Sequence, residues 1–310
     1  MNREPIQVAV GVIKNPADQV LISLRDMHLH QGGLWEFPGG KVEAGETVEQ
    51  ALIRELDEEL AIRVLAFQPL ITVNYIYPDR SVQLCVYEVT EFSGAATGCQ
   101  GQAVKWVNPA DLPCYDFPAA NRPIIAAAQL PSYYAILDGE DESNLMINLN
   151  KILNRKVKLI QARLKKLPEY KVTRFLQQAY PLCQQHRAVL LLNSDCDSAD
   201  LPVDGVHLTS RQLMTLTKRP DSVGWLAASC HNQVELQHAE AIGADFVVLA
   251  PVKSTPTHPD EKPIGWEVFA DLINHINLPV YALGGLSQQD LQQARRCGAQ
   301  GIAAIRAFLK

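Results

Sequence analysis

Three glutamates in the segment GGKVEAGETVEQALIRELDEELAI have the residue type and spacing for metal chemistry. On a helix each residue advances about 100° around the axis, so Glu55, Glu58 and Glu59 share one face and Asp57 points away from it. Carboxylates gathered in this way repel one another unless a cation holds them. Their hard oxygens suit Mg²⁺ or Mn²⁺, which also bind substrate phosphates. The alternative is a solvated acidic helix face without a metal.

The residues before the glutamates favour the metal-binding interpretation. Thr47, with Gln50 three positions later, forms a capping-box pattern, which predicts a helix that begins there and ends near Ala61. Gly39 and Gly40 precede this helix in a glycine-rich loop, HQGGLWEFPGGK. Because glycine has no side chain, it lets the backbone approach another element closely. The sequence therefore predicts an acidic helix face set against a tight stretch of backbone.

The spacing of these residues is similar to the Nudix box: Gly40, five residues, Glu46, seven residues, and then RELDEE at 54–59. Nudix proteins are hydrolases that cleave phosphate chains with the help of a divalent metal. One position departs from the box, because Ala61 stands where the family has a glycine. That position ends a helix, so we expect a small structural cost and retained chemistry.

The resemblance extends to the MutT branch of this family, which hydrolyses 8-oxo-dGTP to the monophosphate and pyrophosphate. QVAVGVI, LWEFPGG, YPDR and FPAANRP occur in the same order and spacing. The resemblance implies a Mg²⁺ (or Mn²⁺) cofactor and a nucleoside triphosphate substrate. A metal-bound water would attack phosphorus, and Glu55 or Glu46 would take its proton. The implied residues are Glu55, Glu46 and Arg54 for catalysis; Gly39, Glu55, Glu58 and Glu59 for the metal; and Arg25, Glu36, Phe37, Arg80 and Asn121 for the substrate.

Two of the matched positions carry alternatives. Asn121 would read the oxidised base through its amide, which has both a donor and an acceptor end. The alternative is a turn residue between two prolines. Gln100 stands where MutT has a further metal-binding glutamate. An amide keeps an oxygen ligand but loses the charge, which predicts lower metal affinity or a ligand shifted to a neighbour.

Composition limits the remaining function classes. The chain has 310 residues, 47% of them hydrophobic, and a net charge of −6. That charge argues against binding of a nucleic acid polymer. The seven cysteines are scattered, which favours reduced thiols in a cytoplasmic protein over disulfides. No apolar run of about 18 residues is present, and the N-terminus does not resemble a secretory signal, so we expect no membrane span. Nothing in the sequence fixes an oligomeric state.

The two halves of the chain have different patterns of apolar residues. These patterns predict a Nudix domain at 1–130 and a second domain at 133–310, with the boundary near Pro131. The first half mixes strand-like runs, such as Ile6–Ile13 and Val20–Leu24, with the predicted helix, which indicates an α/β/α sandwich with a mixed sheet. In the second half eight apolar runs alternate with helix-like stretches, which predicts a compact TIM-like (β/α)8 barrel. An open doubly wound sheet is the alternative. The eight runs are Tyr134–Leu137, Val157–Ile160, Ala188–Leu192, Gly205–Leu208, Val223–Ala228, Phe246–Ala250, Val280–Leu283 and Gly301–Ile305.

The second half resembles thiamine-phosphate synthase and its TenI relatives through YAILDG, LIQARLK, LLLNSD, DGVHL, ASCHNQVE, PVYALGGL and GIAAIRA. The resemblance implies a phosphate site at Gly284, Gly285 and the chain near Ile305. The other implied pocket residues are Arg163, Lys165, Asn193, Ser229, His231 and Thr255.

The implied catalytic positions of the barrel do not match the synthase. Ser194 and Gln212 stand where the synthase has metal-binding aspartates, and His258 stands where it has a lysine that contacts pyrophosphate. Asp195 would replace one aspartate only through a shift of one residue. The sequence therefore favours a barrel that keeps a phosphate pocket without synthase activity.

Three hypotheses follow for the whole chain. The first is an oxidised-purine triphosphate pyrophosphohydrolase that carries a phosphate-binding barrel. The second is a bifunctional thiamine-pathway enzyme, in which the Nudix half hydrolyses thiamine or pyrimidine diphosphates. The third is a barrel that senses a phosphate-containing ligand and regulates the hydrolase.

Overall fold

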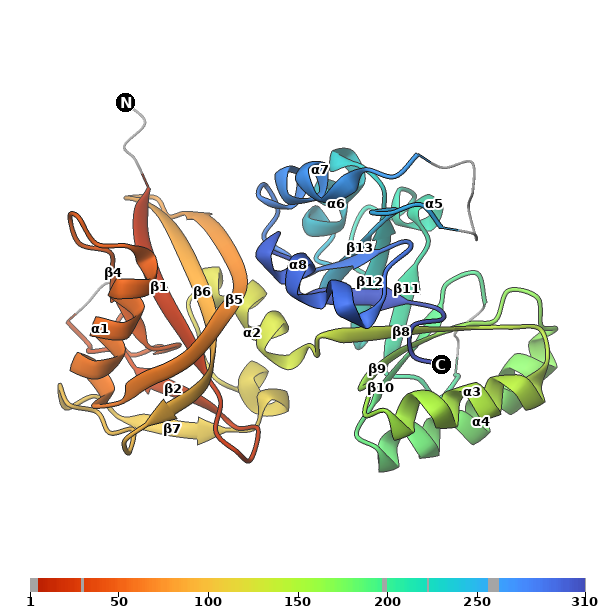
Figure 1. Ribbon diagram of the computed structural model, residues 1–310, viewed down its shortest axis with the longest axis horizontal. Coiled ribbons are helices and arrows are strands. Elements are labelled where there is room, and N and C mark those ends of the chain that lie inside the picture. The colour runs from red at the N-terminus through yellow and green to blue at the C-terminus, as the bar shows by residue number, and fades with distance from the viewer. Residues whose placement is uncertain (1–4, 29–30, 197–199, 222, 256–261, 310) are drawn as a thin grey trace. The chain divides into compact units, whose positions relative to one another are not determined.

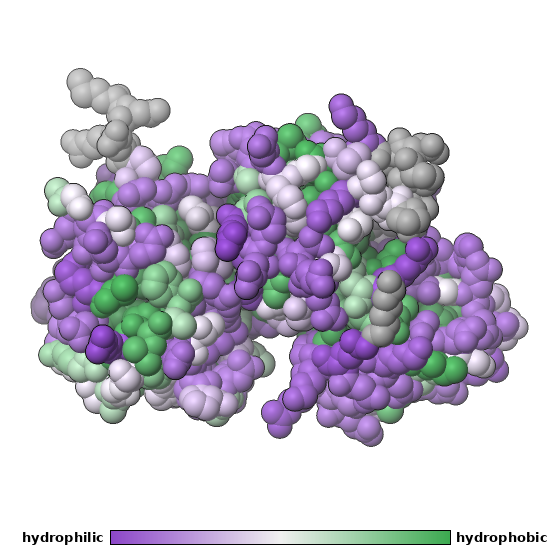
Figure 2. Space-filling view, viewed as in Figure 1, coloured by the Kyte–Doolittle hydropathy of each residue, from purple (hydrophilic) through white to green (hydrophobic). Residues whose placement is uncertain are grey.

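The computed structural model describes residues 5–28, 31–196, 200–221, 223–255 and 262–309, and Figure 1 traces their elements. The chain forms two compact units, Met1–Gln129 and Leu130–Lys310. Hydrophilic residues cover most of the visible face of each unit, and smaller apolar areas lie among these residues (Figure 2). Within the described ranges, no helix is long and apolar enough to cross a membrane.

The first unit contains a mixed sheet of four strands in the order β4-β1-β6-β5. Strand β1 pairs in parallel with β6, and the other two pairings are antiparallel. A second, antiparallel sheet has the order β3-β2-β7. The mixed sheet predicted from the sequence is confirmed. The strands are β1 Ile6–Ile13, β2 Val20–Leu24, β3 Trp35–Glu36, β4 Gly39–Lys41, β5 Arg63–Ile76, β6 Ser81–Ser93 and β7 Val104–Val107.

The glycine-rich segment is more regular than the loop expected from the sequence, because it contributes the short strands β3 and β4. Glu36 pairs with Ser23 of β2, and Gly39 pairs with Val10 of β1. Neither WE nor GGK carries a periodic apolar pattern, so these strands form because a neighbouring strand offers them a partner. They deliver Glu36 and Gly39 to adjacent edges of the two sheets.

Helix α1, Val48–Leu60, carries the three glutamates and lies against β1 and β4 (Figure 1). Its capping box is confirmed, since the Thr47 hydroxyl accepts from the Gln50 N–H and the Gln50 side chain accepts from the Thr47 N–H. Leu52 and Leu56 are fully buried in one cluster with Ala9 of β1. Burying one such leucine stabilises the fold by about 2 kcal/mol. This packing fixes the rotation of the helix and turns its acidic face away from the core.

Helix α1 ends at Ala61, which adopts the left-handed conformation with φ 53° and ψ 37°. A residue with a Cβ is strained there by about 1 kcal/mol, whereas glycine is not. We expect Ala61→Gly to raise the free energy of unfolding by about 1 kcal/mol in urea denaturation. Ala44→Gly, at an exposed position with negative φ, is the control and should give no gain. No gain from Ala61→Gly would mean that the terminus is unstrained.

Three short helical segments complete the first unit. The 3-10 helices η1, Pro109–Cys114, and η2, Ala119–Asn121, lead into helix α2, Arg122–Gln129. The apolar stretch after Pro123 forms most of α2. Asn121 ends η2, where its backbone N–H donates to the Pro118 carbonyl at 2.9 Å.

The second unit is a closed barrel of eight parallel strands, so the closed alternative is confirmed over the open sheet. Closure is made by β15 and β8, where Ile302 pairs with Tyr133. The strands are β8 Tyr133–Asp138, β9 Leu159–Arg163, β10 Val189–Asn193, β11 Gly205–Leu208, β12 Trp225–Cys230, β13 Phe246–Leu249, β14 Val280–Leu283 and β15 Gly301–Ala304. The helices are α3 Glu142–Asn154, α4 Glu169–Gln185, α5 Ser210–Leu213, α6 Gln233–Ala241, α7 Gly265–Ile273, η3 Gln288–Asp290 and α8 Leu291–Arg296.

Two expected strands are displaced along the chain. Strand β12 begins at Trp225, two residues after the expected start at Val223. The run Val157–Ile160 was expected to form a strand, but β9 begins at Leu159. Lys156 has a positive φ of 59°, and the Val157 N–H donates to the Ile152 carbonyl. The first residues of the apolar run therefore still belong to the turn that ends α3.

A polar network lies inside the apolar barrel. His207 of β11 contacts the Tyr134 hydroxyl through Nδ1 at 2.9 Å and the Ser229 hydroxyl through Nε2 at 2.8 Å. Gln161 also donates to the Tyr134 hydroxyl, at 3.3 Å. Burial, assisted by the charge of Lys165, lowers the pKa of His207 from 6.5 to about 3. The imidazole is therefore neutral in the folded barrel at neutral pH.

The depressed pKa of His207 predicts acid sensitivity. Below pH 6.5 His207 binds a proton in the unfolded chain but not in the folded barrel. The contribution of neutral His207 to the free energy of unfolding is therefore complete above pH 6.5 and is lost as pH falls toward 3. In that range the free energy of unfolding falls by about 1.4 kcal/mol for each unit of pH. Between pH 7.5 and pH 5, wild type should lose about 2 kcal/mol more than His207→Asn. This difference is measured by unfolding the full chain in urea and following pulsed hydrogen exchange in peptides from the barrel. The exposed His275→Asn should follow wild type, and equal losses in all three proteins would refute the prediction.

Candidate functional site

Glu55 lies directly over the backbone of β4. A Cβ at position 40 would fall 2.1 Å from the Glu55 carboxyl group, and a Cβ at position 39 would fall 2.1 Å from the Ala9 carbonyl oxygen. Gly39 also has a φ of 147°, which residues with a side chain rarely adopt. Gly39 is thus required by its close approach to the β1 backbone, whereas Gly40 leaves room for the carboxyl group of Glu55.

Arg54 binds three carboxylates at once. Its Nε and Nη2 donate to the two oxygens of Glu46 at 2.9 and 2.8 Å. Its Nη1 donates to Glu55 at 2.9 Å and, more weakly, to Glu58 at 3.4 Å. The hydrogen bonds from Arg54 lower the pKa of Glu46, so Glu46 is ionised at neutral pH. Arg54 therefore orients the carboxylates that the sequence assigned to catalysis.

Glu59 occupies the most buried acidic position of this face. Its carboxylate accepts from the Gly39 N–H at 3.3 Å. Burial, together with the nearby charges of Glu36 and Glu55, raises the pKa of Glu59 to about 7. Burial also raises the pKa of Glu36, although its ion pair with Arg25 opposes this. One carboxylate from β3, Glu36, and one from α1, Glu55, therefore disfavour the charged form of Glu59.

The structure does not gather these acids into a finished metal site. In the part of the chain that is described, no three acidic, histidine or cysteine side chains lie close enough to hold a metal ion. Arg54 holds Glu55 and Glu58, and the Glu58 side chain is 56% exposed. A divalent ion therefore has to compete with Arg54 for these oxygens.

Phe37 and Asn121, which were expected to bind the substrate, lie at an aromatic cluster. Phe37 is buried and stacks on Phe117, with ring centroids 5.2 Å apart. Asn121 is only 8% exposed, and its neighbour Ala120 belongs to the same cluster as Phe37. Phe117 was missed by the sequence reasoning. Its signal is the repeated Phe-Pro pair, at 37–38 and 117–118, which brings two aromatic rings together.

The other substrate residues of this unit differ in their surroundings. Arg25 is paired with Glu36 close to Glu59. Arg80 is exposed and pairs with its neighbour Asp79 at 2.7 Å, and its carbonyl accepts from the Tyr77 N–H. Gln100 lies in an exposed loop whose neighbour Cys99 donates its N–H to the Glu59 carbonyl. The loop is therefore anchored at the end of α1 that carries Glu59.

The cations assigned to the barrel mouth are paired with carboxylates of the same mouth. Arg163, at the end of β9, donates to Asp138 at 2.7 Å, and Lys165 forms an ion pair with Asp195. The buried Asn193 accepts from the Asp195 N–H at 3.2 Å. Asp195 is thus paired with a lysine, and a metal ion at this position would have to compete with Lys165 for its carboxylate.

Ser194 and Gln212 are hydrogen bonded to each other. The Gln212 side-chain nitrogen donates to the Ser194 carbonyl at 2.6 Å, and the two side chains form a second contact. The Thr209 N–H also donates to the Ser194 hydroxyl at 3.1 Å. The two positions that correspond to metal ligands in the synthase therefore form a neutral, mutually satisfied pair. His258 lies outside the described residues.

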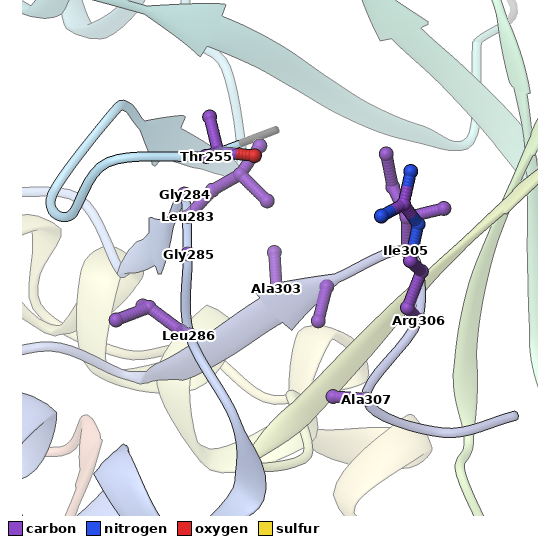
Figure 3. Close-up of a pocket in the computed structure, with 10 residues that line it drawn as sticks. Thr255, Leu283, Gly284, Gly285, Leu286, Ala303, Ile305, Arg306 and Ala307 are labelled. Carbon is purple, nitrogen blue, oxygen red and sulfur yellow. The ribbon is translucent and has the colours of Figure 1, made fainter. Parts of the chain in front are cut away.

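A hollow of about 170 Å³ lies at the ends of β14 and β15. Of the residues expected to form the barrel pocket, it is lined by Thr255, Gly284 and Gly285, and Arg306 joins them (Figure 3). Ser229 contacts His207, and the His231 ring contacts the Ala250 carbonyl at 3.0 Å. Arg306 was missed by the sequence reasoning, although it directly follows the Ile305 position assigned to the phosphate site.

Two family models match the chain. Residues 9–127 match the NUDIX domain, and residues 133–308 match thiamine monophosphate synthase. The two matched stretches correspond in order to the unit that carries the acidic helix and to the barrel.

Individual relatives follow the same division. A protein of Aquifex aeolicus, provisionally named thiamine-phosphate synthase 2, is 34% identical over 59% of this chain and 100% of its own length. The 8-oxo-dGTP diphosphatase of Escherichia coli is 40% identical over 39% of this chain and 94% of its own length. A solved structure from work on MutT of Aliivibrio salmonicida and Vibrio cholerae is 39% identical. That match covers 41% of this chain and 98% of the solved one, with a TM-score of 0.37.

Proposed function

Because the chain belongs to the Nudix hydrolases over residues 9–127 and to the thiamine monophosphate synthase family over residues 133–308, we propose that its first unit is a Mg²⁺-dependent pyrophosphohydrolase. Its substrate is 8-oxo-dGTP, which it cleaves to the monophosphate and pyrophosphate. The observation that carries this proposal is the arrangement around Arg54. One guanidinium orients Glu46 and Glu55 while Glu55 lies against the glycines of β4.

The acidic face of α1 fits a divalent metal ion. Burial and, after it, the charge of Glu36 raise the pKa of Glu59, and a cation beside its carboxylate would offset both effects. Glu55, Glu58, Glu59 and the Gly39 carbonyl would hold the ion, and all are oxygen donors of the kind that Mg²⁺ or Mn²⁺ prefers. When bound, the ion withdraws charge from the phosphate chain and makes it easier to attack.

The residues of the unit then divide the remaining work. Glu55 accepts a proton from the attacking water, whose oxygen forms a bond to phosphorus. The bridging P–O bond between the α and β phosphates breaks, and pyrophosphate leaves with its electron pair. Arg54 keeps Glu55 and Glu46 in position, and its positive charge helps to keep both ionised. Glu46 is the alternative base.

Base selection is assigned to Asn121 beside the Phe37–Phe117 pair. The amide offers a donor and an acceptor, so it can pair with an oxidised purine edge whose donor and acceptor differ from those of the normal base. Its near-complete burial supports this role, because an amide shielded from water gains from a ligand that satisfies it. Arg25, Glu36 and Arg80 are proposed to contact the rest of the nucleotide.

For the barrel we propose a pocket for a phosphate-containing ligand at Gly284 and Gly285, without synthase activity. The neutral Ser194–Gln212 pair supports this proposal, because neither side chain supplies the anionic oxygen that a magnesium–pyrophosphate complex requires.

The testing experiment incubates each substrate with the full chain and Mg²⁺ and separates substrate and products by chromatography, because ADP-ribose and thiamine diphosphate release no pyrophosphate when they are hydrolysed. It compares 8-oxo-dGTP with dGTP, ADP-ribose, dinucleoside polyphosphates and thiamine diphosphate, each with and without EDTA. A kcat/KM for 8-oxo-dGTP well above all others, lost in EDTA, is expected. Preference for thiamine diphosphate would overturn the assignment and favour a thiamine-pathway enzyme.

A further inference from the structure

Residues 130–132 join the barrel to the first unit and close the amino-terminal end of the barrel. Leu130 is only 5% exposed, and it belongs to the apolar cluster formed by inward-facing side chains of the strands, such as Phe246 and Tyr281. A connecting segment ordinarily lies on the surface, because its backbone groups need water. Leu130 instead fills the end of the barrel, and residues 130–132 are called the junction plug below.

The backbone of the junction plug is fixed by hydrogen bonds. The guanidinium of Arg295 donates to the Ser132 hydroxyl at 2.6 Å. Each of the three plug carbonyls also accepts from a residue of the barrel, as buried carbonyls generally require. The donors are the Gln300 side chain to Leu130 at 2.9 Å, the Tyr281 hydroxyl to Pro131, and the Ile302 N–H to Ser132 at 3.0 Å. The plug can therefore leave the barrel only if these bonds break.

A column of contacts extends from the junction plug through the barrel to its mouth. The Tyr281 ring packs on the Tyr134 ring, with centroids 5.6 Å apart. The Tyr134 hydroxyl lies 2.9 Å from Nδ1 of His207, and Nε2 of His207 lies 2.8 Å from the Ser229 hydroxyl. Ser229 is half-buried near the carboxyl end of β12. Four side chains, each in contact with the next, therefore connect the two ends of the barrel.

The hydrogen bonds of this column have a defined direction. Gln161 donates to the Tyr134 oxygen at 3.3 Å, so the hydroxyl proton of Tyr134 needs an acceptor elsewhere. Among the residues that the structure describes, Nδ1 of His207 is the acceptor within reach. His207 therefore carries its own proton on Nε2 and donates it to Ser229. The tautomer of His207 thus depends on where the Tyr134 ring lies.

From this column we propose that the junction plug and the mouth of the barrel are coupled. Loosening the plug frees Tyr281, which shifts the Tyr134 ring and weakens the bonds of His207. Because Tyr281, Tyr134 and His207 are buried and closely packed, a displacement at one end is not absorbed between them. Coupling is reciprocal, so a change at Ser229 loosens the plug in turn. The chain segment that leads to the first unit therefore responds to the state of the mouth, whichever activities the two units have.

The first test uses NMR on the ¹⁵N-labelled full chain. In wild type we expect His207 to carry its ring proton on Nε2. Tyr281→Phe removes the hydroxyl bonded to Pro131 and keeps the ring, so the Ile302 amide should exchange at least about tenfold faster, and the His207 ring nitrogens should shift. Tyr180→Phe is the matched control, because its hydroxyl donates to Asp204 at 3.1 Å outside the column, and it should change neither signal.

The second test starts from the mouth. Ser229→Ala removes the acceptor of His207, and it should also speed exchange of the Ile302 amide, by at least about threefold, as for partial loss of one hydrogen bond. Ser210→Ala is the matched control, because Ser210 lies after the carboxyl end of β11 but outside the column. It should leave the exchange rate of Ile302 unchanged.

The outcomes decide between a coupled and an uncoupled plug. Faster Ile302 exchange in both Tyr281→Phe and Ser229→Ala, with shifted His207 signals in the first, supports the proposal. Faster exchange in Tyr281→Phe with unshifted His207 signals would show a plug that is attached but not coupled, and would overturn it. Wild-type exchange in Ser229→Ala, or a wild-type His207 proton on Nδ1, would overturn it as well. If Tyr281→Phe does not fold, Leu130→Val shortens the plug without changing its polarity and gives the same test.

Discussion

Replacing Glu55 by glutamine should lower kcat for pyrophosphate release from 8-oxo-dGTP by at least about a hundredfold. Glutamine keeps the shape of the side chain and a hydrogen bond to Arg54, but it cannot accept the proton of the attacking water. It also removes one negative charge from the face that is proposed to hold the metal ion. Steady-state kinetics at saturating Mg²⁺ measure the effect on turnover.

The control for Glu55→Gln is Asp57→Asn on the same helix. Asp57 is exposed and lies away from the acidic face, so its variant should keep kcat within about twofold of wild type, as for a surface change away from the chemistry. Circular dichroism melting should give equal stabilities for the two variants. Normal turnover in Glu55→Gln would remove Glu55 from the chemistry and make Glu46 the base to test next.

Replacing Asn121 by alanine should reduce the preference for 8-oxo-dGTP over dGTP by about a hundredfold. The change removes the donor and the acceptor that are proposed to contact the base, while the Phe37–Phe117 pair still provides a surface for either purine. The loss should fall on kcat/KM for 8-oxo-dGTP, and the value for dGTP should change little. Paired measurements on both nucleotides give the ratio directly.

Asn108→Ala supplies the comparison for Asn121→Ala. Asn108 lies in the same unit, before η1, where its side chain contacts Asp111 at 3.2 Å. Its variant should keep the wild-type preference. Unchanged preference in Asn121→Ala would mean that Asn121 only shapes the turn between Pro118 and Pro123, and the base would then be recognised elsewhere.

The barrel was predictable because its strands are carried by local apolar runs. Strands β11 and β14 begin and end where their runs do, since a strand buried on both sides needs continuous apolar residues. Strand β9 was misplaced because its run starts inside the turn after Lys156. Strands β3 and β4 were not predicted, because their existence depends on partners in β2 and β1. The pattern of apolar residues therefore predicted the strands that depend on their own residues and missed those that depend on a partner strand.

The same distinction holds for the sites. The approach of Glu55 to Gly40 followed from the spacing of a helix and two glycines. The set of hydrogen bonds from Arg54 to three carboxylates did not follow from spacing, because the bond to Glu46 depends on how the loop that carries Glu46 folds back. The bond between Ser194 and Gln212 and the position of Arg306 in the hollow depend on closure of the barrel. Ser194 and Gln212 are 18 positions apart, and Arg306 meets the glycine turn only through the fold, so neither arrangement has a local pattern.

The bond between Ser194 and Gln212 has a consequence for redesign of the barrel. Ser194→Asp alone would set a carboxylate against the side-chain oxygen of Gln212, and Gln212→Asp alone would remove the donor to the Ser194 carbonyl. Each single substitution costs stability before a second acid is present to repay it, and proteins tolerate only small losses of stability. Two acids at these positions can therefore be introduced one at a time only through a less stable variant. The hydrogen bonds of the neutral pair thus oppose stepwise engineering of a metal site into the barrel.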